Sequence, residues 1–497
     1  MARFRLVTLC CALTAAFAAA APARAQSLVE LYESARGFDA TYQSALSAYD
    51  AGVARADQAK AGLLPQVGLS ANASHTDQEL RTDFGNVQNT INRGIPQETV
   101  GINATQPLYR PANWATWEQS KRQLDIAQAQ LELAEQDLIV RVSQAYFDVL
   151  AAQDALALVR AQKAATAEQL AFAQRNFEVG TATITDTREA QARYDLVVAQ
   201  EIAAENDLQI RKVALDQLVG RVNAAPTPLA APVQLPPLAP ANLDLWVQQA
   251  EDGHPSILTA ERNMEVARLE VDKARAGHKP TLDAQVGYNV TNNPQGTSTS
   301  TTPAGVRVNA ASIGVVFNLP LFAGFATENR IKETLALEDQ ARSQLDAARR
   351  SVAQATRTAY LGLVSGMGQV KALEAAEASS QSALEANRLG YQVGVRINID
   401  VLNAQSQLFQ TRRDLAQARY NVLLGNLRLR QAAGSLAPAD LQPLNGVLAT
   451  AGNAGAAASP DQPSAATVSP VAPAPAQGVA PPARLTTPPV RPTVPNR

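Results

Sequence analysis

The chain contains one long pattern twice. Its clearest landmarks are two segments, 177–186 and 391–400, which both read aromatic, any residue, Val, Gly, a stretch rich in β-branched residues, and then Asp. Matched positions keep a nearly constant separation: 214 positions relate Gly180 to Gly394, Asp186 to Asp400 and Gly220 to Gly434, and 213 relate Pro107 to Pro320. Such regularity indicates an internal duplication. Any fold for this chain must therefore contain two copies of one unit.

Each of the two segments is predicted to join a very long helix to a return helix. Gly permits a tight turn and Asp is a favoured N-cap, so Asp186 and Asp400 are the predicted first caps of the return helices. The long helices are predicted over 111–178 and 325–391, and the return helices over 186–219 and 400–433. The first long helix has no internal breaker and spans about 100 Å at 1.5 Å per residue.

Small and apolar residues recur along both long helices at alternating intervals of four and three. This spacing is typical of a coiled-coil seam whose small residues allow close approach. The first seam consists of Leu138, Val142, Ala145, Val149, Ala152, Leu156 and Val159, and the second of Val352, Thr356, Ala359, Leu363, Gly366, Val370 and Leu373.

Each copy also predicts a helix and two strands before its long helix. The helices cover 27–64 and 243–277, and the second has a probable break at 253–255. Apolar and polar residues then alternate with a period of two over 66–73, 99–105, 281–290 and 311–319, which predicts strands with one apolar face. Polar stretches at 77–97 and 292–305 are predicted loops.

The remaining segments frame the two copies, which are predicted as structural repeats over 26–223 and 243–441. Residues 1–25 have the charged start, apolar centre and Ala-Arg-Ala end of a signal peptide, so we expect cleavage before Gln26; an uncleaved membrane anchor is the alternative. A Pro/Ala-rich linker is predicted over 224–242, and a disordered tail over 442–497. Both cysteines, Cys10 and Cys11, lie in the leader, so the exported chain has no thiol chemistry.

Four amphipathic strands cannot close a barrel by themselves. An open sheet in lipid would leave unpaired edges, which hydrocarbon does not tolerate, whereas alternation over about ten residues is typical of transmembrane barrels. We therefore expect other copies of the chain to complete the sheet. A soluble four-stranded sheet packed on helices is the alternative; the Gly, Asn, Gln and Thr of the polar strand faces favour a wet lumen.

Several motifs together resemble the TolC-type outer-membrane efflux channels. They are segments 106–114 (QPLYRPANW), the two Val-Gly turns, 184–186, 399–404 and 414–421. The resemblance implies a mainly α protein with transmembrane β structure: a homotrimer with a 12-stranded barrel in outer-membrane lipid and a 12-helix periplasmic tunnel. It implies passive export of substrate from an inner-membrane pump or ABC transporter, through a periplasmic adaptor, in drug efflux or type I secretion. A non-conducting coiled-coil tether is the competing hypothesis.

The resemblance also implies roles for residues near the turns. Thr185 and Asp186 on one side, and Tyr391 and Arg396 on the other, would hold a closed aperture. Arg396 and Asp186 can form a charge-assisted pair that the Tyr391 hydroxyl joins, and an exposed link of this kind contributes about 1 kcal/mol. The alternative for Asp186 is a plain helix cap.

Two further sets of positions follow from the same resemblance. Family members ring the aperture with two acidic residues one helical turn apart; here Asp400 is acidic but the second position is Asn403, so we expect a weaker cation preference. The turns are expected to dock the adaptor through Val179, Gly180, Thr181, Val393, Gly394 and Val395. Ordinary turn glycines are the alternative interpretation.

Nothing in the chain predicts an enzyme, a cofactor or a metal site. His75, His254 and His278 are far apart, without ligand spacing or a cysteine nearby. Without the three arginines of the leader, 40 basic and 45 acidic residues remain, a net charge of −5, and no basic patch suggests nucleic acid as a partner.

Overall fold

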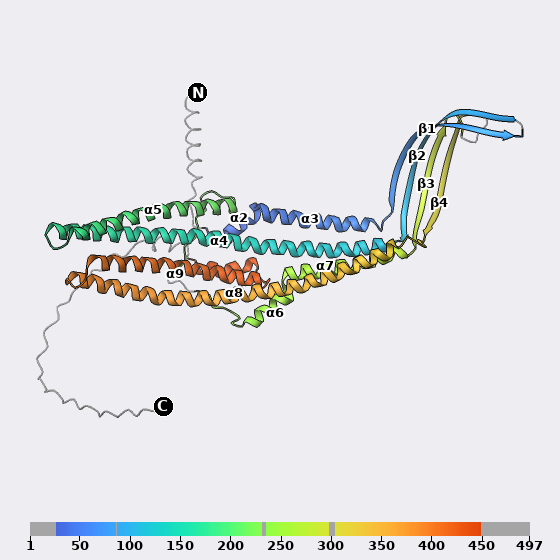
Figure 1. Ribbon diagram of the computed structural model, residues 1–497. Coiled ribbons are helices and arrows are strands. Elements are labelled where there is room, and N and C mark those ends of the chain that lie inside the picture. The colour runs from blue at the N-terminus through green and yellow to red at the C-terminus, as the bar shows by residue number, and fades with distance from the viewer. Residues whose placement is uncertain (1–25, 86, 231–234, 298–303, 449–497) are drawn as a thin grey trace, which may run out of the picture. The chain divides into compact units, whose positions relative to one another are not determined.

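The computed structural model describes residues 26–85, 87–230, 235–297 and 304–448, so the predicted leader 1–25 and residues 449–497 of the predicted tail lie outside it. Figure 1 shows two sets of helices and four strands, in which the elements of the first copy lie beside those of the second. The first copy contains α2 (Leu28–Phe38), α3 (Ala40–Ala61), β1 (Gln66–Phe84), β2 (Val87–Tyr109), α4 (Pro111–Glu178) and α5 (Ile184–Val219). The second contains α6 (Leu243–Gly253), α7 (Pro255–Arg275), the 3₁₀ turn η1 (Ala276–His278), β3 (Thr281–Asn293), β4 (Val306–Asn318), α8 (Ala326–Gln392) and α9 (Asn398–Ala432).

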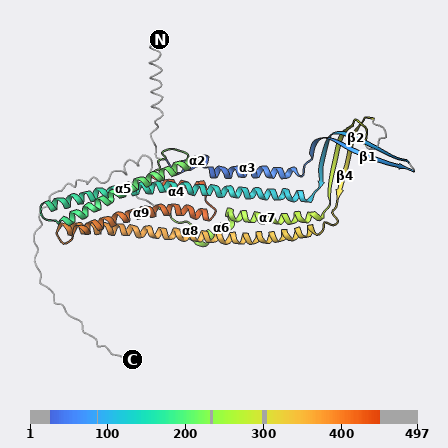
Figure 2. The same cartoon turned by 45° about the horizontal axis from the view of Figure 1, so that its top comes forward.

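The long helices have the predicted extent. Helix α4 has 68 residues and α8 has 67, and each folds back on its return helix, α5 or α9, as the views of Figures 1 and 2 agree. Six of the seven residues of the first seam are buried (Leu138, Val142, Val149, Ala152, Leu156 and Val159). Within the second seam Val352, Thr356, Leu363 and Val370 are buried. The predicted coiled-coil seams are confirmed.

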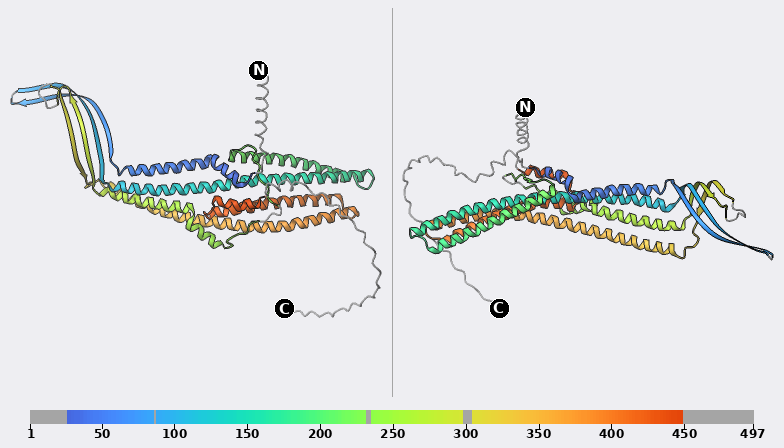
Figure 3. Two further views of the ribbon diagram at one scale, coloured as in Figure 1. Left: turned by 180° about the vertical axis from the view of Figure 1, so that it is seen from behind. Right: turned by 90° about the horizontal axis from the view of Figure 1, so that it is seen from above.

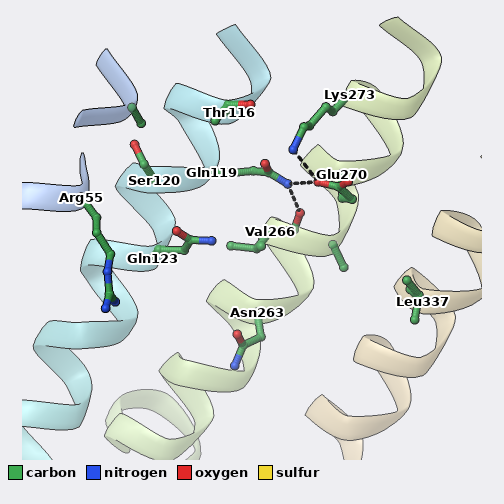
Figure 4. Close-up of a pocket in the computed structure, with 12 residues that line it drawn as sticks. Arg55, Thr116, Gln119, Ser120, Gln123, Asn263, Val266, Glu270, Lys273 and Leu337 are labelled. Carbon is green, nitrogen blue, oxygen red and sulfur yellow. Dashed lines mark hydrogen bonds and ion pairs between the residues drawn. The ribbon is translucent and has the colours of Figure 1, made fainter. Parts of the chain in front are cut away.

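The two copies pack against each other, because α4 contacts α7 and α9 of the second copy as well as α3 and α5 of its own (Figure 3). Near the strands, a pocket of about 430 Å³ lies between α3, α4, α7 and α8. Gln119 of α4 reaches across it and donates from Nε2 to Glu270 Oε2 of α7 at 2.9 Å, as Figure 4 shows. Burial raises the pKa of Glu270, but the hydrogen bonds from Gln119 and Arg330 outweigh that effect and lower it.

The four strands form one antiparallel sheet in the order β1-β2-β3-β4. The predicted loop 77–97 is wrong: β1 and β2 stay paired from Gln66↔Thr105 to Phe84↔Val87, and the chain turns at Gly85, whose φ is +60°. Backbone pairing needs no apolar side chains, so a polar sequence can continue a ladder. β3 and β4 are shorter, with 13 residues each, and the hairpin of β1 and β2 extends beyond them.

The predicted helix 27–64 is two helices. Asp39 adopts an extended conformation between α2 and α3, and its Oδ1 accepts from Tyr42 N at 2.8 Å as the N-cap of α3. Arg141 of α4 donates to both carboxylate oxygens of Asp39, at 2.9 and 3.0 Å. A capping residue held by a distant arginine therefore divides the alanine-rich run, two residues after Gly37.

The predicted disordered tail begins too early. After the 3₁₀ turn η2 (Pro438–Asp440), α10 (Leu441–Val447) is helical, and its Leu441 and Leu444 are buried in the core cluster that includes α2. Leu448 lies in the same cluster. Three leucines at spacings of three and four bury one helical face, so this segment folds back onto the amino-terminal helix.

Residues 224–230 and 235–242 of the predicted linker form no helix or strand beyond isolated bridges. Tyr146 holds it against α4 by donating its hydroxyl to Thr227 O at 2.9 Å. The break predicted at 253–255 is present, since α6 ends at Gly253 and α7 begins at Pro255. Among the described helices, none is both long and apolar enough to cross a bilayer.

Candidate functional site

The two turns at the ends of the long helices have nearly the same backbone. Gly180 has a φ of +77° and Gly394 of +78°. Thr181 N donates to Asn176 O at 2.8 Å, and Val395 N donates to Gly390 O at 2.9 Å. A Cβ on either glycine would meet nothing within 4 Å, so the positive φ rather than space requires glycine here.

These turns expose an unusual amount of apolar surface. Val179 is 73% exposed in the first turn, and Val393 and Val395 are 66% and 75% exposed in the second. Ile184 and Ile397, at the start of each return helix, are also exposed. Thr181 is exposed beside them. Clustered apolar residues at a helix tip indicate a contact surface.

The predicted caps are wrong in both turns. Thr183 is the N-cap of α5, and Asp186 lies three residues later, where its carboxylate accepts from Thr183 N at 3.0 Å in a capping box. Ile397 is the N-cap of α9, without a side-chain bond, and Asp400 is again three residues later. A β-branched residue in extended conformation precedes each helix, so the aspartates lie inside the first turn. There their negative charge interacts favourably with the positive end of the helix dipole.

The structure separates the predicted gate residues within one protomer. Arg396 Nη1, in the turn before α9, lies 3.5 Å from Asp400 Oδ2 in the first turn of that helix, while Asp186 is held by Thr183. The Tyr391 ring packs edge-on against Phe172 of α4, with centroids 5.9 Å apart. Thr185 is exposed. Within the described contacts of one protomer, the expected pair of Arg396 with Asp186 is therefore not formed.

Asn398 joins the two copies beside the turns, and the sequence analysis missed it. Its side chain is fully buried. Its Oδ1 accepts from Gln169 Nε2 of α4 at 2.5 Å, and its Nδ2 donates to Asp186 O of α5 at 3.4 Å. The matched position 214 residues earlier is the apolar Ile184, so a break in the duplication was the available signal.

A second link lies one turn further along α9. Arg193 of α5 donates from Nη2 to Asn403 Oδ1 at 2.8 Å. The structure thus brings the predicted ring position Asn403 to a cation of the first copy, while Asp400 lies next to Arg396. Each of the two ring residues therefore has an arginine as its partner.

A buried carboxylate ties the same helices together further from the turns. Tyr420 of α9 donates its hydroxyl to Asp154 Oδ2 of α4 at 2.6 Å. Burial raises the pKa of the Asp154 carboxyl, and the hydrogen bond from Tyr420 lowers it by less, so the net direction is upward.

Two of the three histidines have structural roles. His254 Nδ1 accepts from Ser256 N at 3.0 Å as the N-cap of α7, and burial lowers its pKa. His75 lies 3.2 Å from Asp77 on β1. Over the described ranges, no three His, Cys, Asp or Glu side chains come together as metal ligands.

The sequence is similar to a known protein family and to several known proteins. The family model described as "Outer membrane efflux protein" matches residues 31–221 and 246–435. The chain is 33% identical to the outer membrane protein TolC of Vibrio cholerae over 86% of its length and 95% of that protein. It is 31% identical to the alkaline protease secretion protein AprF of Pseudomonas aeruginosa, over 84% and 86% of the two chains.

A solved structure shares the fold. The outer membrane protein VceC of Vibrio cholerae superposes with a TM-score of 0.68 at 20% identity, over 82% of this chain and 96% of that one. The two matched stretches of the family model cover more than half of the sequence and contain both helix tips with their strands. The chain belongs to the outer membrane efflux protein family.

Proposed function

We propose that the chain is the outer-membrane channel of an efflux or type I secretion system, which passes substrate outward without catalysing a reaction. The single observation that carries this proposal is the amphipathic four-stranded sheet at the end of an extended helical coiled coil, in a member of the outer membrane efflux protein family. Relatives are named for protease secretion as well as for efflux. The same channel architecture would serve either protein secretion or efflux.

The sheet supports a channel built from several protomers. Within the described chain, β1 and β4 are its outer strands, and each pairs on one side only. Three copies of the four strands would close a 12-stranded barrel and leave no edge in lipid. Val67, Leu69, Ile102 and Ile313 are each more than half exposed in the single protomer, as lipid-facing residues would be.

The segments outside the sheet fit the same assembly. We infer that residues 1–25 are removed on export, and that repeats 26–223 and 243–441, joined by the linker 224–242, contribute the periplasmic tunnel. Twelve helices would come from α4, α5, α8 and α9 of three protomers, with the shorter helices completing the wall beside the strands. The tail begins after Leu448 in this proposal, because α10 packs in the core.

The aperture would close between protomers rather than within one. Arg396 Nη1 is 3.5 Å from Asp400 Oδ2 of the same protomer, which is a long and exposed contact. The Asp186 carboxylate of a neighbouring protomer can therefore compete for Arg396. Thr185 and Tyr391 would complete this contact, and Asp400 and Asn403 would line the opening. Weak exposed links suit a gate that must open.

The helix tips would receive a periplasmic adaptor linked to an inner-membrane pump or ABC transporter. The support is the exposed apolar group formed by Val179, Val393 and Val395 around Gly180 and Gly394, with Thr181 beside it. An adaptor that buries these valines gains about 25 cal/mol per Å² of apolar surface removed from water.

Reconstitution tests the channel directly. Protein extracted from outer membranes should have the mass of a trimer and should conduct ions after insertion into planar bilayers. A monomer, or a trimer without conductance, would instead favour the second hypothesis, a coiled-coil tether.

A further inference from the structure

A polar pocket lies between α4, α5 and α9, next to the ring position Asn403. Its volume is about 400 Å³. Two half-buried guanidinium groups line it, from Arg193 of α5 and Arg413 of α9. The buried side chains of Gln162 and Thr166 line it from α4. Of the residues that line the pocket, only Asn403 has a role in the channel proposed above.

The two arginines of the pocket have only amide oxygens as described side-chain partners. Arg193 donates to Asn403 Oδ1, and Arg413 donates from Nη2 to Gln410 Oε1 at 2.7 Å. No aspartate or glutamate is among the lining residues of this pocket within the described chain. A guanidinium has five N–H donors in a fixed fork, so both cations keep donors for an anion, and the planar fork matches a carboxylate.

Two acidic residues that are close to the arginines in the sequence accept hydrogen bonds from glutamines instead. Asp195 of α5 accepts from Gln191 at 2.9 Å, and Asp414 of α9 accepts from Gln410 at 2.8 Å. Both are exposed, and neither lines the pocket. The positive charge of the pocket is therefore not neutralised by a close carboxylate.

Gln200 indicates independently that a ligand of this pocket should carry a hydrogen-bond donor. It lines the pocket from α5, and its buried Oε1 accepts no hydrogen bond from any described residue. A buried acceptor without a donor destabilises the protein, because it has lost its hydrogen bonds to water without gaining others. A ligand that brings a hydroxyl or ammonium donor next to its carboxylate would satisfy this atom and the two arginines together.

We propose that this pocket binds a carboxylate that carries a neighbouring hydrogen-bond donor, as in a hydroxy acid or an amino acid. The bound carboxylate bridges Arg193 of α5 and Arg413 of α9 beside the aperture position Asn403. Since α5 and α9 belong to different copies, occupancy ties the two helical hairpins together. The binding chemistry does not depend on conduction.

Calorimetry on the purified trimer tests the site with two matched probes. Citrate has three carboxylates and a hydroxyl, and tricarballylate has the same three carboxylates without the hydroxyl. We expect citrate to bind, tricarballylate to bind several-fold more weakly, and the double variant Arg193→Gln/Arg413→Gln to weaken citrate binding at least tenfold. The matched control Arg188→Gln, on α5 outside the pocket, should bind citrate as the parent chain does.

Two results would overturn the proposal: no citrate binding by the parent trimer, or unchanged binding by the double variant. Equal affinity for the two acids would overturn the role of Gln200. Arg193→Lys keeps the charge but loses the fork, so it should bind citrate with intermediate affinity, which separates recognition from misfolding. Conductance recorded on the same trimers keeps a failure of this site distinct from a failure of the channel.

A second arm distinguishes the sources of the carboxylate in cells. A photocrosslinking residue in place of Gln407, which lines the pocket, reports what enters it. An adduct mapped to a peptide with Asp or Glu at the crosslink assigns a side chain of a protein partner. Citrate binding without such an adduct assigns a free solute.

Discussion

Asn398 shows how one side chain can hold two duplicated units together. It is the buried partner of both Gln169 of α4 and the Asp186 carbonyl of α5, so α9 begins where the first copy already provides a donor and an acceptor. A buried amide with both ends bonded fixes position, because any displacement leaves polar atoms unpaired. Arg193 and Asn403 link the same two helices, α5 and α9, by a single hydrogen bond.

Replacing Asn398 should loosen the tips. Asn398→Ala leaves the Gln169 amide without its partner, at about 1–3 kcal/mol, and removes a long bond to the Asp186 carbonyl of α5. Single-channel recording should show the open fraction increased about tenfold or more. Asn387→Ala is the matched control, since Asn387 is half-buried and its one described side-chain hydrogen bond goes to Ala383 O of its own helix. Equal gating of the two variants would contradict a role for Asn398 in closing the tips.

The Asp154 carboxyl predicts a defined pH dependence. Its folded pKa is raised by burial, so the charged form costs stability and the cost grows as pH rises from the unfolded pKa through the folded one. Asp154→Asn should therefore raise the melting temperature at neutral pH. The gain should vanish in acid, below about pH 4, where the parent carboxyl is protonated in both states. Thermal unfolding across pH measures this, and a gain independent of pH would contradict it.

At the scale of elements, small residues set the distance between α8 and α9. A Cβ at Gly366 would lie 3.3 Å from Val422 Cγ2 of α9, closer than ordinary contact, whereas a Cβ at Gly362 would meet nothing within 4 Å. Both glycines are inside the same helix, so they share the same backbone cost and differ in packing. The seam position is small because two helices approach each other there.

This contrast predicts opposite outcomes for the same substitution. Gly362→Ala should stabilise the protein by roughly 1 kcal/mol, the gain in helix propensity over glycine. Gly366→Ala should lose that gain to crowding against Val422, which typically costs about 1–3 kcal/mol. Denaturant unfolding in detergent compares the variants. Equal stabilisation of both would show that α8 and α9 are not closely packed at Gly366.

At the scale of the whole molecule, each residue of the helix tips is present three times in the proposed trimer. Asp400 and Arg396 are close to each other, and Arg193 binds Asn403, so the opening would carry more fixed cations than anions at these positions. Charges that line a narrow opening act on permeating ions at short range. The weaker cation preference expected from Asn403 follows from this arrangement.

Restoring the second acidic position tests this charge pattern. Asn403→Asp should increase the cation preference of the channel, but only modestly, because Arg193 lies within hydrogen-bond distance of the new carboxylate. Asn403→Asp combined with Arg193→Gln should increase it further. Reversal potentials under a salt gradient measure the preference. If neither variant shifted the reversal potential, these positions would not line the conducting path.

The sequence alone determined the helices, strands and turns whose signals are local. The period of 3.6 or 2, the positive φ that Gly180 and Gly394 require, and the breaker at Pro255 all act within a few residues, so α4, α8 and the seams matched prediction. The tertiary structure decided what depends on distant partners. Arg141 makes Asp39 a helix boundary, and strand pairing extends β1 and β2 through a polar stretch. The roles of Asn398 and Asn403 depend on their hydrogen-bond partners, Gln169 and Arg193, which are distant in the sequence. The sequence alone does not show which group a polar side chain will bond.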